Sequence, residues 1–272
     1  MPTFSPATTK ILQLSQTLTA SPNEIVAAIR LDPVLTGKVL QLVNSAYFSL
    51  AQKITSLNRA LVYLGINTIK NLALSTAVMQ AFETKNKELA DLIRPSWRHS
   101  LATAVCTKNI ARAANVPANE VEEYFIAGLL HDLGQITMIQ AFFTTDPHNG
   151  RLTLEEEKAR YGVSHNEVGA DTLRRWKFSD EWIEAVANYC SPKTGNKLSY
   201  FIHIADAMTY RLQLNGDGEA GAPRDIIPDA WSVVGLSEEQ VLAELESAHE
   251  QIEKAEIFLN IASSKEKVVE QT

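Results

Sequence analysis

The sequence predicts an all-α fold, and three observations support this prediction. Apolar residues recur at helical spacing along most of the chain. The 12 glycines and 10 prolines among the 272 residues lie between these periodic segments, whereas many short strands would need more turn residues. Polar residues that can cap helices stand directly before several of the apolar runs. No segment must be a strand, so we expect a multi-helix bundle.

Capping signals mark the helices of the N-terminal part. Residues 21–24 (SPNE) place a capping serine, a proline at the first helical position and a glutamate at the third, which together predict a capping box. The pair Asp32-Pro33 repeats the device and predicts a second helix. Two more helices are expected over residues 56–64 and 67–82, with a break at Gly65.

The middle of the chain predicts two longer helices. We interpret the charged stretch at residues 83–91 as a solvated connector. Pro95 is expected to open a helix that runs through Ala114. Asn119 is expected to cap the next helix, whose apolar side extends as far as Leu133.

The C-terminal part continues the helical pattern. Four helices are expected near residues 152–161, 164–176, 179–189 and 197–214. Loops are expected at 144–151 and in the Gly-rich segment 215–224. Ser237 should cap one last long helix that ends near Ala262. The composition favours a division near residue 90, with an N-terminal helical part over 1–90 and a second part over 91–272 that carries most of the histidines.

Composition and charge exclude several classes of protein. The 25 Lys and Arg residues against 32 Asp and Glu residues give a formal charge of −7, which argues against a protein that grips a nucleic-acid backbone. Two cysteines without a CxxC pair make no disulfide framework and indicate a reducing compartment. The N-terminus lacks a secretory pattern and no run approaches the ~18 apolar residues of a membrane span. We therefore expect a cytoplasmic protein without a membrane partner.

The strongest chemical feature is the pair His131-Asp132 within an apolar segment. Both groups cost free energy if they are buried without partners, and a divalent metal would satisfy both. The alternative is a helix C-terminus, with Gly134 as the cap and His131 favoured near the carbonyl ends. The dipeptide alone favours this alternative.

Two further residues favour the metal. His99 lies early in the preceding helix, and Asp206 lies in mid-helix among small and apolar residues. With His131 and Asp132 they supply two imidazoles and two carboxylates from three helices, a set that could hold one metal inside a helical bundle. In the alternative interpretation, His99 and Asp206 form a buried hydrogen-bonded pair and Asp132 accepts from a nearby arginine.

At these residues the sequence resembles a known family. The order His, then His-Asp, then Asp is similar to the HD superfamily of metal-dependent phosphohydrolases. Further segments are similar to the HDOD domains of that superfamily, and these are residues 29–36, 39–46, 54–61, 64–65 and 127–134, His165 with residues 168–170, and Trp176. The resemblance covers roughly residues 10 to 260, and we identify the chain as a member of the HDOD family.

The resemblance implies an HD-like helical bundle with an N-terminal helical subdomain. It also implies a role in bacterial signalling, because most HDOD domains are regarded as non-catalytic modules that are often fused to cyclic-dinucleotide enzymes or receiver domains. The length of the chain leaves no room for such a fused domain, so we expect a stand-alone module. The resemblance predicts neither a particular partner nor an oligomeric state.

Departures from catalytic relatives weaken the enzymatic interpretation. The HD-GYP relatives, which cleave cyclic di-GMP, carry a lysine just after the His-Asp turn, where this chain has the neutral Gln135. They also carry a pair of histidines in the helix before the last Asp, and residues 187–190 contain none. The resemblance therefore implies a single divalent metal at most: Fe, Mn, Mg, Ni or Zn. His165 could be a leftover ligand or a cap, but a structural or solvent-facing role is favoured.

Two functions follow as hypotheses. The first is a signalling or regulatory module with a degenerate metal pocket, which acts through a protein partner or a small phosphorylated ligand. The second is a metal-dependent phosphohydrolase that acts on a nucleotide or another phosphate ester. In the second case the metal would activate a bound water, Asp132 would hold the ion or orient the water, and His165 would aid the leaving group.

Overall fold

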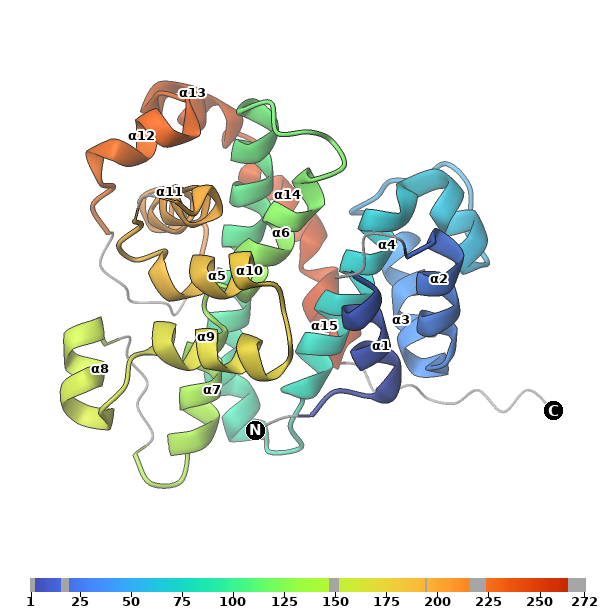
Figure 1. Cartoon of the computed structure of the whole chain (residues 1–272), viewed down its shortest axis with the longest axis horizontal. Helices are drawn as coiled ribbons and strands as arrows, with labels where there is room; N and C mark the ends of the chain where they lie inside the picture. Colours follow the sequence, from blue (N-terminus) through green and yellow to red (C-terminus); the bar gives the residue numbers. More distant parts are fainter. Residues whose placement is uncertain (1–2, 16–19, 147–151, 194, 216–223, 264–272) are drawn as a thin grey trace. The chain divides into compact units, whose positions relative to one another are not determined.

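The computed structural model describes residues 3–15, 20–146, 152–193, 195–215 and 224–263. Within these ranges the regular structure is helical throughout and contains no strand, which confirms the all-α prediction (Figure 1). The described residues divide into two compact units: those within 84–255 form one, and those within 3–83 together with 256–263 form the other. No helix in the described part of the chain is long and apolar enough to span a membrane.

The N-terminal unit is a helical bundle of α1 (Pro6–Ser15), α2 (Pro22–Arg30), α3 (Pro33–Val43), α4 (Leu57–Ala81) and α15 (Ile257–Ser263). The predicted capping box is confirmed, because the Ser21 hydroxyl accepts from the backbone N–H of Glu24 at 3.3 Å and the Glu24 carboxylate accepts from the N–H of Ser21 at 2.8 Å. Asp32 caps α3 as predicted. The break at Gly65 is also confirmed, because this residue interrupts α4 with a φ of +76°.

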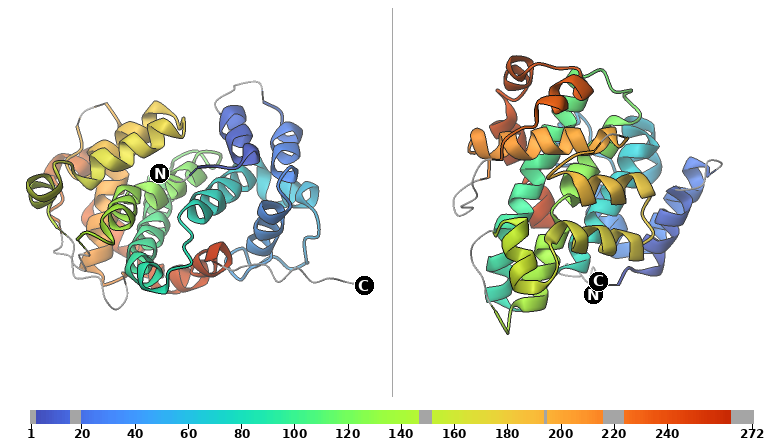
Figure 2. Two further views of the ribbon diagram at one scale, coloured as in Figure 1. Left: turned by 90° about the horizontal axis from the view of Figure 1, so that it is seen from below. Right: turned by 60° about the vertical axis from the view of Figure 1, so that its left-hand side comes forward.

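The second unit is built around one long helix. Its helices are α5 (Lys87–Ala113), α6 (Val121–Leu130), α7 (Leu133–Phe142), α8 (Leu154–Tyr161), α9 (His165–Arg175), α10 (Asp180–Asn188), α11 (Lys197–Arg211), α12 (Pro228–Val234), α13 (Glu238–Glu244) and α14 (Ala248–Ala255). Helix α5 packs against α6, α7, α11, α13 and α14, and α9 packs against α7, α8 and α10 (Figures 1 and 2). Helices α5, α6, α7 and α11 therefore meet in the core of this unit.

The prediction that Pro95 opens a helix is wrong. Helix α5 begins at Lys87, inside the stretch expected to be a connector, and Pro95 lies in its interior. Asn86 caps the true start by accepting a hydrogen bond from the N–H of Leu89 at 3.2 Å. A proline inside a helix removes one hydrogen bond, and burial of apolar side chains on both sides of it offsets this loss.

The expected Asn119 cap is also wrong. Helix α6 begins at Val121, and its N-cap position, Glu120, makes no capping hydrogen bond through its side chain. A backbone turn takes the place of the cap, because the carbonyl of Pro117 accepts from the N–H of Glu120 at 2.8 Å and of Val121 at 3.2 Å.

The C-terminal segment is more broken than predicted. Ser237 does cap a helix, with Gln240 completing its capping box, but the expected long helix is divided into α13, α14 and α15. Helix α12 was not predicted. Buried apolar residues at Val241, Leu245 and Ala248 keep helical spacing across the first break, so periodicity alone predicts one continuous helix. Of the expected loops, residues 147–151 and 216–223 lie outside the described residues.

Candidate metal centre

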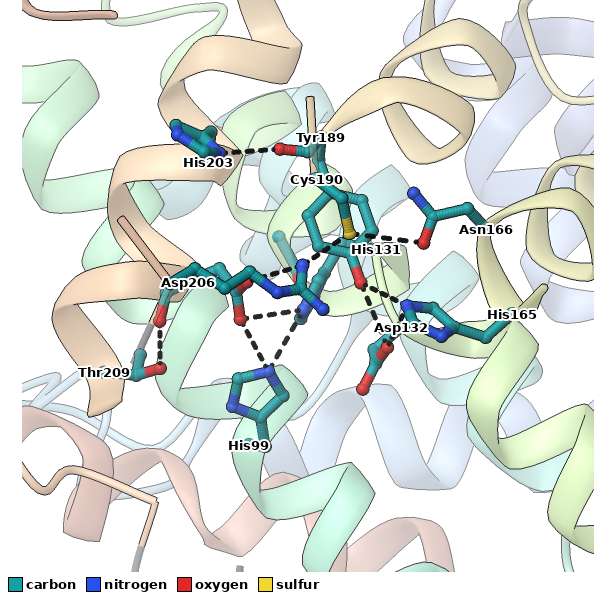
Figure 3. A network of polar contacts seen from close by, with 12 residues as sticks. His99, His131, Asp132, His165, Asn166, Tyr189, Cys190, His203, Asp206 and Thr209 are labelled. Atoms are coloured by element: carbon teal, nitrogen blue, oxygen red, sulfur yellow. Dashed lines mark hydrogen bonds and ion pairs between the residues drawn. The ribbon is translucent and has the colours of Figure 1, made fainter. Parts of the chain in front are cut away.

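Four residues predicted as a metal set lie together in the core of the second unit (Figure 3). His99 comes from α5, His131 follows the end of α6, Asp132 precedes α7, and Asp206 lies on α11. Their exposed fractions are 0%, 0%, 0% and 1%, respectively. Three segments that are far apart in the sequence therefore bury four polar residues at one point of the fold.

The donor atoms are spaced as ligands of one ion would be. The two imidazole Nε2 atoms of His99 and His131 lie 3.2 Å apart, and Asp206 Oδ1 lies 3.0 Å from the first and 3.7 Å from the second. Donor atoms of Asp132 and the two histidines all lie within 4.8 Å of one another. Metal–ligand bonds of about 2.0–2.2 Å place adjacent ligand atoms about 3.0–3.6 Å apart. The 3.2 Å and 3.0 Å distances from His99 Nε2 fall within this range, whereas the 3.7 Å distance and the wider spacing to Asp132 exceed it, so the side chains would have to draw together around an ion.

A polar contact at Nδ1 of each imidazole orients the Nε2 atoms of His99 and His131 toward the pocket. Nδ1 of His131 lies 2.7 Å from the carbonyl oxygen of Gly128, and Nδ1 of His99 lies 3.0 Å from Oδ1 of Asn215. Both partners are acceptors, so with a metal bound each Nδ1 would carry the hydrogen and each Nε2 would direct its lone pair to the ion. Without a metal, the contact of His99 Nε2 with Asp206 Oδ1 at 3.0 Å needs a hydrogen on that nitrogen. Histidines that bind metals are typically held in this way. The donor set therefore fits a divalent ion.

Two glycines allow the helices of the site to approach closely. A Cβ on Gly128 would lie 2.7 Å from Cα of Ala104, so this glycine lets α6 approach α5. A Cβ on Gly134 would lie 1.8 Å from the carbonyl oxygen of His165, so this glycine lets α7 approach α9. Gly134 lies inside α7 and is not a helix cap. The alternative interpretation is therefore wrong in making Gly134 the cap, but it is right that a helix ends here, because α6 ends at Leu130 and His131 occupies its C-cap position.

A second polar network supports Asp132. Its Oδ1 accepts a hydrogen bond from the Tyr189 hydroxyl at 3.2 Å, and that hydroxyl lies 3.0 Å from Nε2 of His165. Nδ1 of His165 lies 2.7 Å from Oε2 of Glu157, and both residues are 1% exposed. Of the two roles favoured for His165, structural or solvent-facing, the solvent-facing one is therefore wrong. This residue belongs to a buried chain that ends on Asp132 (Figure 3).

An arginine lies at the edge of the pocket. Nη1 of Arg224 lies 3.0 Å from Oδ2 of Asp206, and its guanidinium carbon lies 5.2 Å from the ring centre of Tyr189. The same guanidinium donates to Sγ of Cys190. The predicted alternative is confirmed in its first half, since His99 and Asp206 do form a buried pair. The arginine it expected at Asp132 lies instead beside Asp206.

Burial and charge shift the titration of these groups. Burial lowers the pKa of His131 against the opposing effect of Asp206. Burial alone would raise the pKa of Asp206, but Arg224 and the two histidines hold it well below its usual range. Burial alone would lower the pKa of His165, but contacts with Cys190 and Glu157 outweigh this effect and raise the pKa to about 9. The pocket therefore holds an ionised Asp206 beside a neutral His131.

Sequence reasoning missed Tyr189, Glu157, Asn215 and Arg224. Tyr189 follows α10 in a helical apolar pattern, which is typical of an ordinary core residue. Glu157 lies in a run of three glutamates on α8, and only its burial separates it from its neighbours. Asn215 and Arg224 border the Gly-rich segment, where no spacing links them to a helix of the site.

Comparison with known proteins identifies relatives of this architecture. The family model of the HDOD domain matches residues 1–192. An uncharacterised protein of Treponema pallidum is 27% identical over 177 residues, which are 60% of this chain and 32% of that protein. The matched region thus spans about a third of the curated relative's length.

Solved structures show the same fold. An HDOD domain protein of unknown function from Geobacter sulfurreducens matches with a TM-score of 0.72 at 22% identity, over 95% of this chain and 93% of the other. A Shewanella amazonensis protein whose name proposes a phosphohydrolase matches with a TM-score of 0.71 at 20% identity, over 95% of each chain. A Marinobacter aquaeolei protein whose name proposes a role in signal transduction matches with a TM-score of 0.73 at 18% identity, over 97% of this chain and 60% of the other.

Proposed function

Since this chain belongs to the HDOD family, we propose that it works as a signalling or regulatory module whose buried His/Asp pocket binds a single divalent metal. In this proposal the metal-bound and metal-free pockets are two states of the module, and a protein partner distinguishes between them. The Marinobacter relative, whose name proposes signal transduction, supports this class of function.

The burial of the pocket is the observation that carries the proposal. A hydrolytic metal site keeps a coordination position open to water and substrate. Here the four candidate ligands are at most 1% exposed, and Tyr189, which contacts Asp132, is 0% exposed. Asp206 is paired with His99 and Arg224. A centre enclosed in this way suits a structural or sensory metal better than one that turns over a substrate.

The residues of the pocket have separate tasks in this proposal. His99, His131, Asp132 and Asp206 would hold the ion. When bound, a divalent metal supplies a Lewis acid and lowers the pKa of a coordinated water. Tyr189 donates its hydroxyl hydrogen to Asp132 and so fixes the orientation of that carboxylate.

A metal-dependent phosphohydrolase is the second candidate. The ligand-like spacing of the Nε2 and Oδ1 atoms favours it, because the same spacing would serve a catalytic ion. The Shewanella relative, whose name proposes a phosphohydrolase, also favours it. The neutral Gln135 argues against it, since catalytic HD-GYP relatives carry a lysine at this position.

Metal analysis combined with a turnover assay tests the proposal. The purified chain is loaded separately with Mn²⁺, Fe²⁺, Zn²⁺, Ni²⁺ and Mg²⁺, and bound metal is measured together with hydrolysis of p-nitrophenyl phosphate and nucleotides. We expect about one bound ion per chain, lost in H131A, and no turnover above the metal-free control. Turnover that H131A and D132A abolish would establish the phosphohydrolase instead. Absence of bound metal under all five conditions would refute the metal pocket.

A further inference from the structure

We propose that Arg224 is a built-in counter-cation of the pocket, which competes with a divalent metal for Asp206. The inference rests on the metal pocket of the proposed function and adds a regulatory element to it. In the metal-free state the guanidinium neutralises the buried carboxylate. In the metal-bound state the ion takes over this task and Arg224 is displaced toward solvent.

The two oxygens of Asp206 face different partners. Oδ1 lies 3.0 Å from Nε2 of His99 and 3.7 Å from Nε2 of His131, so it points into the candidate metal position. Oδ2 lies 3.0 Å from Nη1 of Arg224. The guanidinium and the candidate metal position thus face different oxygens of the Asp206 carboxylate, and this residue is only 1% exposed.

The charges around the pocket favour one cation over two. Asp132 and Asp206 carry two negative charges when both are ionised, and a divalent ion alone neutralises them. The nearby pair of Glu157 and His165 is neutral as a whole when both groups are charged. A metal and the Arg224 guanidinium together would leave an excess positive charge in a buried site, which is unfavourable. Electrostatics therefore favours exchange of one cation for the other.

Arg224 has a path by which it can leave. Its side chain is 25% exposed, while the carboxylate it contacts is buried. The guanidinium also contacts the face of Tyr189 and the sulfur of Cys190. The arginine also begins the segment that leads into α12, and this segment is held at Ile227, whose N–H donates to Nε2 of His203 at 3.1 Å. Release of Arg224 would therefore alter the chain just before α12, where a partner could detect the change.

The test compares Zn²⁺ binding by the full chain and by three arginine variants, measured by isothermal titration calorimetry and by thermal unfolding. R224Q removes the positive charge of Arg224, and R224K retains it. As a control, R211Q removes the charge of Arg211, the last residue of α11, which pairs with Glu238. We expect R224Q to bind Zn²⁺ about tenfold tighter or more, because a repelling charge has been removed. R224K and R211Q should remain within about threefold of the wild type.

Thermal unfolding gives a second readout that does not depend on turnover. Metal-free R224Q should unfold at a lower temperature than the wild type, and Zn²⁺ should raise its Tm by more than it raises that of the wild type. If H131A abolishes Zn²⁺ binding but R224Q binds Zn²⁺ no more tightly than the wild type does, the metal pocket stands and only the proposed role of Arg224 is overturned. If neither the wild type nor R224Q binds Zn²⁺ in a manner that H131A abolishes, both this inference and the metal pocket are refuted.

Discussion

Replacing Gly134 by alanine should destabilise the second unit and weaken its metal pocket. The added Cβ would lie 1.8 Å from the backbone carbonyl oxygen of His165 and 2.6 Å from the backbone nitrogen of Gly169. Real Cβ contacts are essentially never below 3.0 Å, so α7 and α9 would have to separate by about 1.2 Å or more. The obstacle is backbone, which cannot rotate away as a side chain does.

The cost follows from this overlap. Overpacking typically costs about 1–3 kcal/mol, and we take about 3 kcal/mol because the obstacle is rigid. Alanine in a helix regains about 1 kcal/mol relative to glycine, so the net loss in the free energy of unfolding is about 2 kcal/mol. This corresponds to a fall in Tm of about 4–8 °C. Because α7 begins directly after Asp132, the affinity for Zn²⁺ should fall as well.

Urea unfolding followed by circular dichroism measures the effect, with G162A as the matched control. Gly162 has a φ of +77° and open space around its Cβ position, so its substitution costs only the left-handed strain of about 1 kcal/mol. The control should leave Zn²⁺ affinity unchanged. If G134A is no less stable than G162A and binds Zn²⁺ as the wild type does, the close approach of α7 and α9 is not what requires the glycine.

Three further predictions concern the network around the pocket. Tyr189→Phe removes the hydroxyl between Asp132 and His165 and should cost about 1–3 kcal/mol in urea unfolding, because buried partners lose their hydrogen bond; a loss below about 0.5 kcal/mol would contradict the network. The pKa of His165 is raised from 6.5 to about 9, so protonation of this residue contributes to the free energy of unfolding. This contribution is fully present below pH 6.5 and is lost as the pH rises through 9. Glu157→Gln should flatten this decline in the Tm of metal-free protein, and an unchanged slope would argue against the pair. Asn215→Leu leaves Nδ1 of His99 without this acceptor and should weaken Zn²⁺ binding about 10–100-fold by calorimetry; wild-type affinity would refute the orienting role.

The fold was largely predictable because its local signals are strong. Ser21, Asp32 and Ser237 cap helices as predicted, and Gly65 interrupts α4 as predicted. The errors arose where tertiary contacts override local signals. Pro95 lies inside a helix because its neighbours are buried, and the breaks after α13 and α14 preserve the apolar spacing of a continuous helix.

The pocket was predictable only in part. His131, Asp132 and Asp206 stand out in the sequence because they interrupt apolar segments, and His99 joins them as a histidine in the preceding helix. The structure brings all four together. Their role as metal ligands stays a prediction. Arg224 could not be predicted, because the identity of the group that neutralises a buried carboxylate depends on how a distant loop returns to the core.

Helix α15 has a consequence for the order in which the chain folds during synthesis. It packs on α3 and α4, where Phe258 is 1% exposed and stacks edge-on against Tyr47 with the ring centres 5.3 Å apart. The ribosome releases residues 84–255 before this helix emerges, so the second unit can complete its core first. The N-terminal unit, although it is made first, keeps an apolar face exposed until residues 257–263 arrive. Its nascent form should therefore be the stage of biosynthesis most open to chaperones and to aggregation.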